Sequence, residues 1–509
     1  MSTAEASRRA FLQVASTFAG LGDLAMPFGV NLAAVGAAAA QASSSSDYKA
    51  LVCVFLLGGN DAANMVLPTD AGSWTRYLSA RDTGSSSISL PAVGMPPAGG
   101  LGTVTQLGGV LPIVPRTPQS IPAGTSGAGT RTFALHPALP KMQGLFNRGK
   151  LAIVANVGTL IQPVSKSQNG GKQWVVPRAL FSHGDQANLW QSGTGESARY
   201  GWAGQMADLF VAGNATPLVS SVSTSISAVL LSGRKVGEYQ VGYDFGRQSA
   251  TPIHIYVPND TSYLGSAAAP AIIKTMITSP AGNSYFQHDH AAVVLRSLNA
   301  ETALNAAFAG VKVTPPSQYV NPLNGRSSTN LVATQLQSVA QFISARQAFG
   351  TKRQVFFVGV GGFDTHTAQS ARQPDLMAQL DHALDYFYAT LQSGIGTDMT
   401  ANVTTFTMSD FGRTFSTNGG GTDHGWGSHQ LIMGGAVKGG DIYNQFPTMG
   451  ADVPGKFDNP NALVNGVLIP TYSVDQYAST LGSWFGVSGS DLGTIFPNLI
   501  NFSATQTFI

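Results

Sequence analysis

Runs of consecutive apolar residues recur along the chain, and segments with helical periodicity separate several of them. Five such runs contain β-branched and aromatic residues, and most of them end close to glycine: 51–57, 149–158, 353–366, 402–412 and 429–437. Continuous apolar runs of this length are typical of strands that are buried on both faces of a parallel sheet. We therefore predict five central strands.

Amphipathic segments precede three of these strands, at 137–149, 330–349 and 374–392. In the second segment, apolar side chains recur at helical spacing and fall on one face: Leu331, Leu336, Val339, Phe342 and Ile343. The alternation of strands with helices predicts an α/β fold with a mostly parallel sheet.

Two segments do not follow this alternation. Residues 85–130 are rich in Pro, Gly and Ser and have almost no charge, so we predict a long inserted loop or a small β excursion. Residues 217–280 are irregular and β-rich, and they are a candidate cap over a functional site at the end of the sheet.

The composition excludes several classes of function. The 28 Lys+Arg residues and 26 Asp+Glu residues give a net charge of +2, so charge gives no support for nucleic-acid binding. Cys53 is the single cysteine, which excludes an intrachain disulfide and cysteine-type zinc clusters. Because Cys53 lies within the first apolar run, we expect a buried, inert thiol.

The N-terminus has the features of an export signal. The stretch "SRRAFLQVAS" (7–16) resembles the twin-arginine signal, and a mildly apolar stretch (14–40) and an "AQA" cleavage pattern follow it. We predict a signal peptide over 1–42, recognition by the twin-arginine translocase, and a periplasmic or secreted protein. Because Asp23 and Pro27 interrupt the apolar stretch, we predict no permanent membrane span.

Acidic and imidazole side chains follow the predicted strands. Asp61 follows the first strand, Asp364 and His366 follow the third, and Asp410 and Arg413 follow the fourth. Ligands of open α/β sheets bind at the carboxyl ends of the strands, so we expect these side chains to converge. Carboxylates and imidazoles together suit zinc, manganese or iron, whereas sites made only of oxygen atoms suit calcium or magnesium. The pattern predicts a site for one or two divalent ions.

The stretch "GTDHGWGSH" adds Asp423, His424 and His429 soon after the fourth strand. Each stretch alone also has a structural interpretation, since "GGNDAAN" around Asp61 suits a turn and Asp364 could cap a segment. The metal hypothesis rests on the strand ends taken together. His288 and His290 have ligand spacing but lie away from the strand ends, so we predict that they are surface or helix-capping residues.

A candidate nucleophile lies in "FSHGDQANLWQSG", where Ser182 precedes His183 and Asp185. A serine hydroxyl is a weak nucleophile until a base or a metal lowers its pKa, and a nearby metal site could do so. The same serine also fits an ordinary helix N-cap, and both interpretations stay open.

Several longer motifs occur in a fixed order along the chain: "SRRAFL", "FLLGGNDAANMVLP", "LHPALPKM", "GKLAIVANVG", "FSHGDQANLWQSG", "YGWAGQMAD", "GGFDTH" and "SDFGRTFSTNGGGTDHGWG". Together they resemble the domain of unknown function 1501 family of exported bacterial proteins, which is grouped by remote similarity with the alkaline phosphatase superfamily. The resemblance implies one alkaline-phosphatase-like domain over 48–509, a three-layer α/β/α sandwich with loop-rich insertions.

The resemblance also implies roles for individual residues. It implies that Asp61, Asp364, His366, Asp410 and His424 bind metal. The residue pattern beside His424 adds Asp423 as a further candidate metal ligand. Ser182 would be the nucleophile, with His183 beside it in the catalytic group, and Arg413 would pair with a substrate oxyanion. Phe411 stands where the superfamily pattern has a second-ion histidine.

Three functions remain as hypotheses. The first is an exported metal-dependent hydrolase that acts on a phosphate or sulfate ester of a small molecule or glycan. The second is a non-catalytic, metal-stabilised binding or assembly protein of the cell envelope. The third is a carbohydrate-modifying enzyme in which Trp174, Trp190 and Trp426 line a sugar site. Cys53 lacks the sequence context of a formylglycine residue, so a formylglycine sulfatase is not expected.

Overall fold

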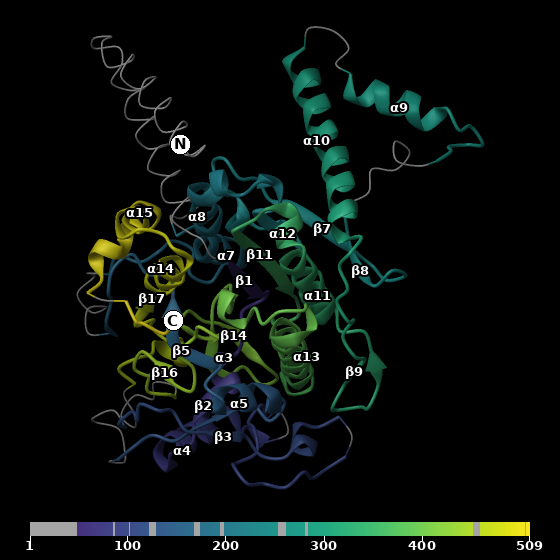
Figure 1. Cartoon of the computed structure of the whole chain (residues 1–509). Coiled ribbons are helices and arrows are strands. Elements are labelled where there is room, and N and C mark those ends of the chain that lie inside the picture. Colours follow the sequence, from purple (N-terminus) through teal and green to yellow (C-terminus); the bar gives the residue numbers. More distant parts are fainter. Residues whose placement is uncertain are drawn as a thin grey trace, which may run out of the picture.

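The computed structural model describes residues 48–84, 87–100, 102–121, 129–166, 174–193, 198–252, 261–279, 284–450, 459–503 and 505–509. They form a body built around one large sheet, and one pair of helices projects from that body (Figure 1). The predicted signal peptide over 1–42 lies outside the described residues. Among the helices that the structure describes, none is both long and apolar enough to cross a membrane.

The central sheet has ten strands within the described residues, in the order β16-β5-β15-β12-β1-β11-β6-β7-β8, and β17 also pairs with β5. The strands are β1 (Lys49–Leu56), β5 (Leu151–Gly158), β6 (Ser221–Ser223), β7 (Tyr239–Asp244), β8 (Ser249–Pro252), β11 (Arg353–Val360), β12 (Val403–Ser409), β15 (Ser428–Met433), β16 (Ile442–Tyr443) and β17 (Tyr472–Ser473). All five predicted strands are present, and the sheet is mostly parallel. The exceptions are β15, which runs antiparallel to β12 and β5, and β8, which runs antiparallel to β7.

Strand β1 shows how the apolar runs create two cores. Its alternate residues Val52 and Val54 belong to the core on one face of the sheet, while Leu51 and Phe55 belong to the core on the other. A strand that is buried on both faces needs apolar residues at every position, which is what the run provides. Cys53 is fully buried, as predicted, and burial raises the pKa of its thiol.

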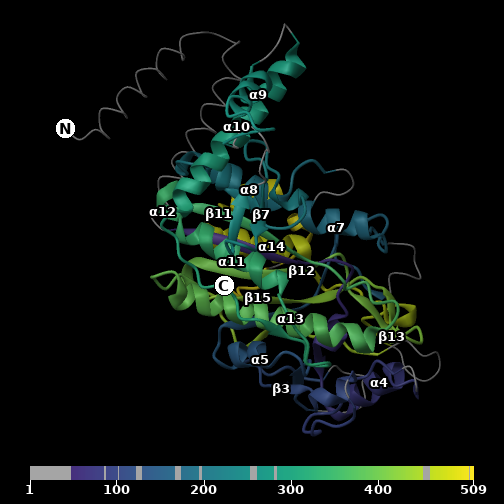
Figure 2. The same cartoon turned by 90° about the vertical axis from the view of Figure 1, so that its right-hand side faces the viewer.

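Helices cover both faces of the sheet. The helices packed in the first core are α5 (Pro140–Asn147), α11 (Leu331–Ser344), α12 (Arg346–Phe349) and α13 (Gln369–Ala389). The helices packed in the second core are α7 (His183–Ser192), α8 (Trp202–Phe210), α14 (Val474–Phe485) and α15 (Gly489–Ile495). Figure 2 shows the sheet between these layers. The predicted three-layer α/β/α architecture is therefore confirmed.

The two irregular segments take different structures. Part of 85–130 forms η3 (Val104–Leu107) and β3 (Leu111–Ile113), and β3 joins β2 (Val66–Pro68) and β4 (Phe133–Leu135) in a small sheet. Within 217–280, β6, β7 and β8 extend the central sheet. The segment then continues into α9 (Ala269–Thr278), which forms the projecting arm with α10 (Tyr285–Phe308; Figures 1 and 2). That this segment caps the site stays a prediction.

The remaining elements are short. They are α3 (Ala62–Met65), α4 (Ala71–Arg81), β9 (Tyr319–Val320), β10 (Ser327–Ser328), β13 (Arg413–Thr417), β14 (Thr422–His424), and the single-turn helices at Val211–Gly213, Pro217–Val219, Val229–Leu231, Thr390–Gly394, Thr400–Asn402, Val464–Gly466 and Pro497–Asn501. Of these, α3, α4, β13 and β14 lie next to the site described below. His288 and His290 are exposed on α10, in agreement with the surface role predicted for them.

Candidate metal centre

The candidate site lies at the carboxyl ends of three adjacent parallel strands. Leu56 pairs with Val360 of β11 and with Ser409 of β12, so the loops that follow these strands begin at the same level. The loops also touch, because a Cβ atom at Gly58 would lie 2.4 Å from the backbone nitrogen of Asp364. Gly58 has a φ of 114°, a conformation that favours glycine. The absence of a side chain at Gly58 thus allows the Asp364 loop to approach.

Two further elements complete the site. His183 is the first residue of α7, and His424 ends β14. Strands β13 and β14 form an antiparallel pair in which Arg413 lies opposite His424. This pairing places a guanidinium group and an imidazole at the same end of the hairpin.

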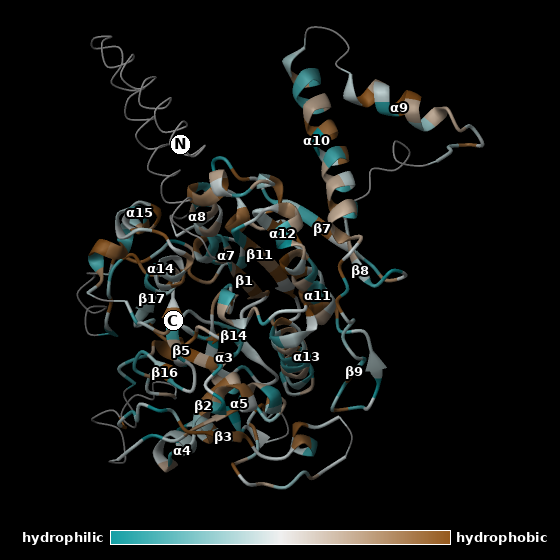
Figure 3. Cartoon of the chain, viewed as in Figure 1, coloured by the Kyte–Doolittle hydropathy of each residue, from teal (hydrophilic) through white to brown (hydrophobic). Residues whose placement is uncertain are grey.

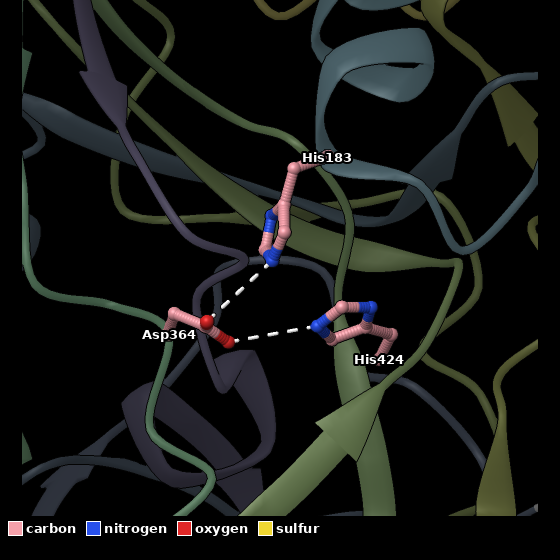
Figure 4. Close-up of side chains that lie close together, drawn as sticks. All are labelled: His183, Asp364 and His424. Carbon is pink, nitrogen blue, oxygen red and sulfur yellow. Dashed lines mark ion pairs between the residues drawn. The ribbon is translucent and has the colours of Figure 1, made fainter.

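Three imidazoles surround the carboxylate of Asp364. The Nε2 atoms of His366 and His424 lie 3.2 and 3.6 Å from Asp364 Oδ1, and His183 Nε2 lies 3.6 Å from Asp364 Oδ2. Figure 4 shows His183 and His424 pointing toward Asp364 from two sides. The ligand atoms of His183, Asp364 and His424 all lie within 4.8 Å of one another, close enough to hold one metal ion.

The opposite ring nitrogen of each histidine has an oxygen partner. His183 Nδ1 lies 2.7 Å from Asp410 Oδ2, His366 Nδ1 lies 3.1 Å from Asp423 Oδ1, and His424 Nδ1 lies 2.7 Å from the carbonyl oxygen of Phe181. A carbonyl oxygen can only accept, so Nδ1 of His424 carries a proton and its Nε2 presents a lone pair. Acceptors at Nδ1 are the usual support of metal-binding histidines, because they orient the ring and fix its tautomer.

The contact between His366 and His424 points to a cation. Their Nε2 atoms lie 2.9 Å apart. When both rings carry their proton on Nδ1, two lone pairs face each other at this distance and repel. A metal ion or a proton between them would remove the repulsion. Ligand atoms held 2.0–2.1 Å from one tetrahedral zinc ion are about 3.3 Å apart, so the two Nε2 atoms are close to ligand spacing. The arrangement therefore fits a bound cation.

The pKa values of the three acidic groups at the site are shifted in different directions. Partial burial raises the pKa of Asp364, but the hydrogen bond and the positive charge of Arg413 outweigh it, so the pKa lies below its ordinary value. Burial raises the pKa of Asp410, and the hydrogen bond from His183 only partly offsets this. The pKa of Asp423 is lowered, mainly by the hydrogen bond from Asn418.

Burial also lowers the pKa of His424, and the charges of His183 and Arg413 act in the same direction. His424 is therefore neutral near pH 7, which is the form that binds a metal.

Asp61 lies outside this cluster. Its carboxylate is buried and accepts from both terminal nitrogens of Arg81 on α4, and from Gln369. It also caps α3 by accepting from the backbone of Ala63. Because both oxygens are engaged by a buried cation, these contacts give Asp61 a structural role outside the candidate centre.

Arg413 is placed differently from the prediction that it pairs with a substrate oxyanion. Its guanidinium has no exposed surface, and Nη1 donates to Asp364 Oδ1 at 2.7 Å and to the carbonyl oxygen of Gly58 at 3.0 Å. Its other nitrogens donate to Thr422. A buried group with these partners orients Asp364 instead of facing a substrate.

Ser182 lies at the edge of the centre. It is the N-cap of α7 and its Oγ accepts from the backbone nitrogen of Asp185 at 3.5 Å. Its neighbours in the chain both serve the cluster, since the carbonyl oxygen of Phe181 holds His424 and His183 faces Asp364. The position supports the N-cap interpretation and leaves the nucleophile role as a prediction.

Several partners could not be recognised in the sequence. The carbonyl oxygen of Phe181 carries no side-chain signal, and the Asp410–His183 contact joins residues 227 positions apart. Phe411 stacks on both His183 and His424 with ring centroids 4.7 Å apart, so it forms an apolar wall where the superfamily pattern has a ligand.

Other candidates from the sequence lie in the interior. His429 is fully buried, accepts from the backbone nitrogen of Asn156, and has its pKa lowered to about 3 by burial. Trp190 and Trp426 are core residues, with 1% of their surface exposed, which does not support the hypothesis that they line a sugar site. Trp174 is partly buried and packs against Trp426.

A family model described as "Protein of unknown function (DUF1501)" matches residues 48–496. The chain belongs to the DUF1501 family. The match includes every residue of the candidate centre, and it confirms the family resemblance for the sequence motifs that lie within 48–496. No curated protein matches this DUF1501 chain.

Solved structures with some likeness include the PsFucS1 sulfatase from Pseudoalteromonas sp., with 9% identity and a TM-score of 0.33 over 90% of this chain and 71% of that chain. Ps i-CgsB in complex with k-i-k-neocarrahexaose shares 10% identity, with a TM-score of 0.32 over 89% and 76%. A mutant of the alkaline phosphatase PafA shares 12% identity, with a TM-score of 0.24 over 54% and 60%. TM-scores this low give no information about the chemistry of this chain.

Proposed function

We propose that this DUF1501 protein is an exported, metal-dependent hydrolase of phosphate or sulfate esters. The observation that supports this most is the convergence of three imidazole Nε2 atoms on one carboxylate, with an oxygen partner at each Nδ1. Two of them, His366 and His424, are costly as a purely structural feature when both carry their proton on Nδ1, because their Nε2 lone pairs then face each other at 2.9 Å. They suit the binding of a divalent cation.

His183, Asp364 and His424 would hold the ion, and His366 is placed to be a further ligand. Three imidazoles with one carboxylate suit zinc, iron or manganese better than calcium, which prefers oxygen ligands. The geometry supports one ion, since Asp61 pairs with Arg81 and Phe411 takes the place of a second-ion histidine. Such an ion supplies positive charge that activates a hydroxyl nucleophile and stabilises charge on the transferred group.

The surrounding residues would position this centre. Arg413 fixes Asp364, Asp410 orients His183, and Asp423 orients His366. Ser182 is the candidate nucleophile because it lies at the N-terminus of a ten-residue helix, where exposed N–H groups and the helix dipole favour anions such as phosphate or sulfate. The ester class follows from the family resemblance, and the metal cradle beside a hydroxyl is consistent with it.

A second candidate function is a non-catalytic, metal-stabilised binding or assembly protein. The projecting arm favours it, because α9 and the beginning of α10 expose large apolar side chains, including Tyr285 (92% exposed) and Phe286 (89% exposed). Figure 3 shows hydrophobic turns along both helices of the arm. Such patches are typical of interaction surfaces. The capping role of Ser182 is also compatible with a site that has no nucleophile.

Elemental analysis of the full chain, purified after export, tests the metal. We expect at least one transition-metal ion per chain, and His424→Ala should reduce it. His290→Ala, which changes an exposed histidine on α10, is the matched control and should leave the metal content unchanged. A metal-free protein whose thermal stability does not respond to added zinc, manganese or iron would count against the centre.

Turnover of an aryl phosphate and an aryl sulfate then separates the two functions. Ser182→Asn is the sharpest variant, because asparagine keeps an N-cap but removes the hydroxyl. We expect activity to fall to a residual rate while folding and metal content persist. An unchanged rate would exclude Ser182 as the nucleophile, and metal-loaded wild type with no turnover would favour the binding protein.

The export component is tested separately with the double variant Arg8→Lys/Arg9→Lys. We expect this variant to stay in the cytoplasm, and its normal export would contradict the proposed route.

A further inference from the structure

A cavity whose lining shares no residue with the metal centre lies at the C-terminal end of α7. It has a volume of about 390 Å³, within the range of small-molecule sites. Its walls are formed by the segment after β5, the segment before α7, the last turn of α7, the first turn of α14 and Asn498. The lining is mostly apolar: Leu160, Ile161, Val176, Pro177, Leu189 and Val474.

Asp475 is the unusual member of this lining. It is the second residue of α14, only 3% of its surface is exposed, and its Oδ2 has no hydrogen-bond partner among the described residues. Burial raises its pKa to about 7, and a hydrogen bond from Asn498 only partly opposes this. A buried carboxyl group without a cation is unfavourable, so it calls for an explanation.

Asp381 on α13 shows what a structural explanation looks like. Burial also raises its pKa to about 7, but its two oxygens accept from the backbone nitrogens of Lys141 and Met142 at the start of α5. Asp381 therefore satisfies a helix end that needs acceptors. The N-terminus of α14 already has a complete capping box in Ser473 and Gln476, so Asp475 is not needed for that purpose.

The polar end of the cavity presents acceptors. Thr159 donates its hydroxyl proton to Gln186, so its Oγ1 can only accept, and it already accepts from Trp426 Nε1 at 3.2 Å. Asp475 accepts when ionised, and Asn498 offers a carbonyl oxygen beside it. Arg178 is the other ionisable residue of the lining, and it is an exposed residue whose charge solvent screens. Acceptors at the end of an apolar cavity complement a ligand that carries several N–H donors.

We infer that this cavity binds a small primary amine with an apolar body, whose ammonium group pairs with Asp475 while its hydrocarbon part fills the space between α7 and α14. The ammonium supplies the missing partner of Oδ2 and compensates the buried charge. The site is distinct from the metal centre, although α7 is common to both, since His183 begins the helix and the cavity lies at its end. It does not depend on the proposed hydrolase activity.

Calorimetric titration of the full chain with 2-phenylethylamine tests this inference, and 2-phenylethanol is the uncharged probe of the same shape. At about pH 8, where Asp475 is ionised, we expect the amine to bind at least about tenfold more tightly than the alcohol, which is the factor that about 1.4 kcal/mol gives. Asp475→Asn should abolish the preference. Asp82→Asn, which removes an exposed carboxylate elsewhere, is the control and should keep it.

A second variant distinguishes loss of the cavity from a general loss of structure. Leu189→Trp narrows the cavity from the α7 side, and it should weaken both probes while leaving the unfolding midpoint within a few degrees of wild type. The inference is overturned if the two probes bind equally to wild type, or if Asp475→Asn retains the preference for the amine. Because no step requires turnover or metal, failure of the hydrolase proposal would leave these results unaffected.

Discussion

Strands β1 and β11 lie side by side, and the loops that follow them have nearly the same sequence. The two loops nevertheless place their aspartates in opposite environments. The first loop is Gly58-Gly59-Asn60-Asp61, and the second is Gly361-Gly362-Phe363-Asp364. Asp61 is buried against Arg81, whereas the side chain of Asp364 is 47% exposed and faces three imidazoles. The comparison teaches that an aspartate after a strand becomes a ligand or a structural anchor according to the cation beside it.

A shift of one residue separates the two loops. Leu56 is opposite Val360, so Asp61 follows the paired position by five residues and Asp364 by four. The extra residue in the first loop lets Asp61 cap α3 and face α4, where Arg81 lies. Asp364 instead remains near the carboxyl end of β11, where the guanidinium of Arg413 contacts its Oδ1 through Nη1. One oxygen of Asp364 thus stays available to His183.

The largest expected effect comes from Asp61→Asn. Because the side chain of Arg81 has no exposed surface, removal of its only ion-pair partner among the described residues leaves a buried positive charge. We expect the free energy of unfolding to fall by about 3–5 kcal/mol, measured by urea denaturation. Asp61→Asn/Arg81→Met should recover part of this loss, because it removes both charges. A loss below about 1 kcal/mol would show that Asp61 is not the anchor that its contacts indicate.

Asp364→Asn should produce the opposite phenotype. The half-exposed side chain can still accept from Arg413 through its amide oxygen, so we expect a smaller change in unfolding free energy than for Asp61→Asn. Metal affinity, measured by competition with a chelating dye, should fall at least about 100-fold, because a charged ligand is lost. If Asp61→Asn lowers metal affinity as much as Asp364→Asn does, the separation of the two aspartates is wrong.

Asp410→Asn sharpens the comparison through a residue that supports a ligand without being one. Asp410 is buried and lies 2.7 Å from His183 Nδ1. Replacing this carboxylate with a neutral amide should weaken metal binding by about 10–100-fold, which is the usual effect of losing the hydrogen-bond partner of a metal-binding histidine. The metal-to-protein ratio at saturation should stay unchanged. A lower ratio at saturating metal would instead place Asp410 among the ligands, as the family resemblance implies.

The sequence was sufficient for β1, β5, β11 and β12, because these strands are buried on both faces and need apolar residues at every position. It did not place the shorter strands β6, β7, β8, β16 and β17 in the sheet. It did not indicate that β15 runs antiparallel, since an apolar run has no direction. At the site, the sequence identified His424, Asp364 and His366 through their places after strands. It could not separate Asp61 from Asp364, because Arg81 lies 20 residues from Asp61 and only the fold brings them together.

The smallest expected effect extends the comparison to Asp475, an acid that has no ion-pair partner among the residues that the structure describes. Its pKa is raised from an ordinary value near 3.9 to about 7 in the folded state, so between these values the folded protein holds a proton that the unfolded chain has released. Stability from this group is present below about pH 4 and is lost as the pH rises to about 7. Asp381 contributes in the same direction, so the wild type must be compared with Asp475→Asn.

Between about pH 5 and pH 6, the unfolding free energy of wild type should fall relative to Asp475→Asn by about 1 kcal/mol, close to the 1.36 kcal/mol that one proton gives per pH unit. Urea unfolding at the two pH values measures this difference. Asp82→Asn, whose carboxylate is exposed, should follow wild type at both pH values. Equal pH dependence of wild type and Asp475→Asn would mean that an unseen partner already compensates Asp475, and the amine cavity would then lack the unpaired acid on which its selectivity rests.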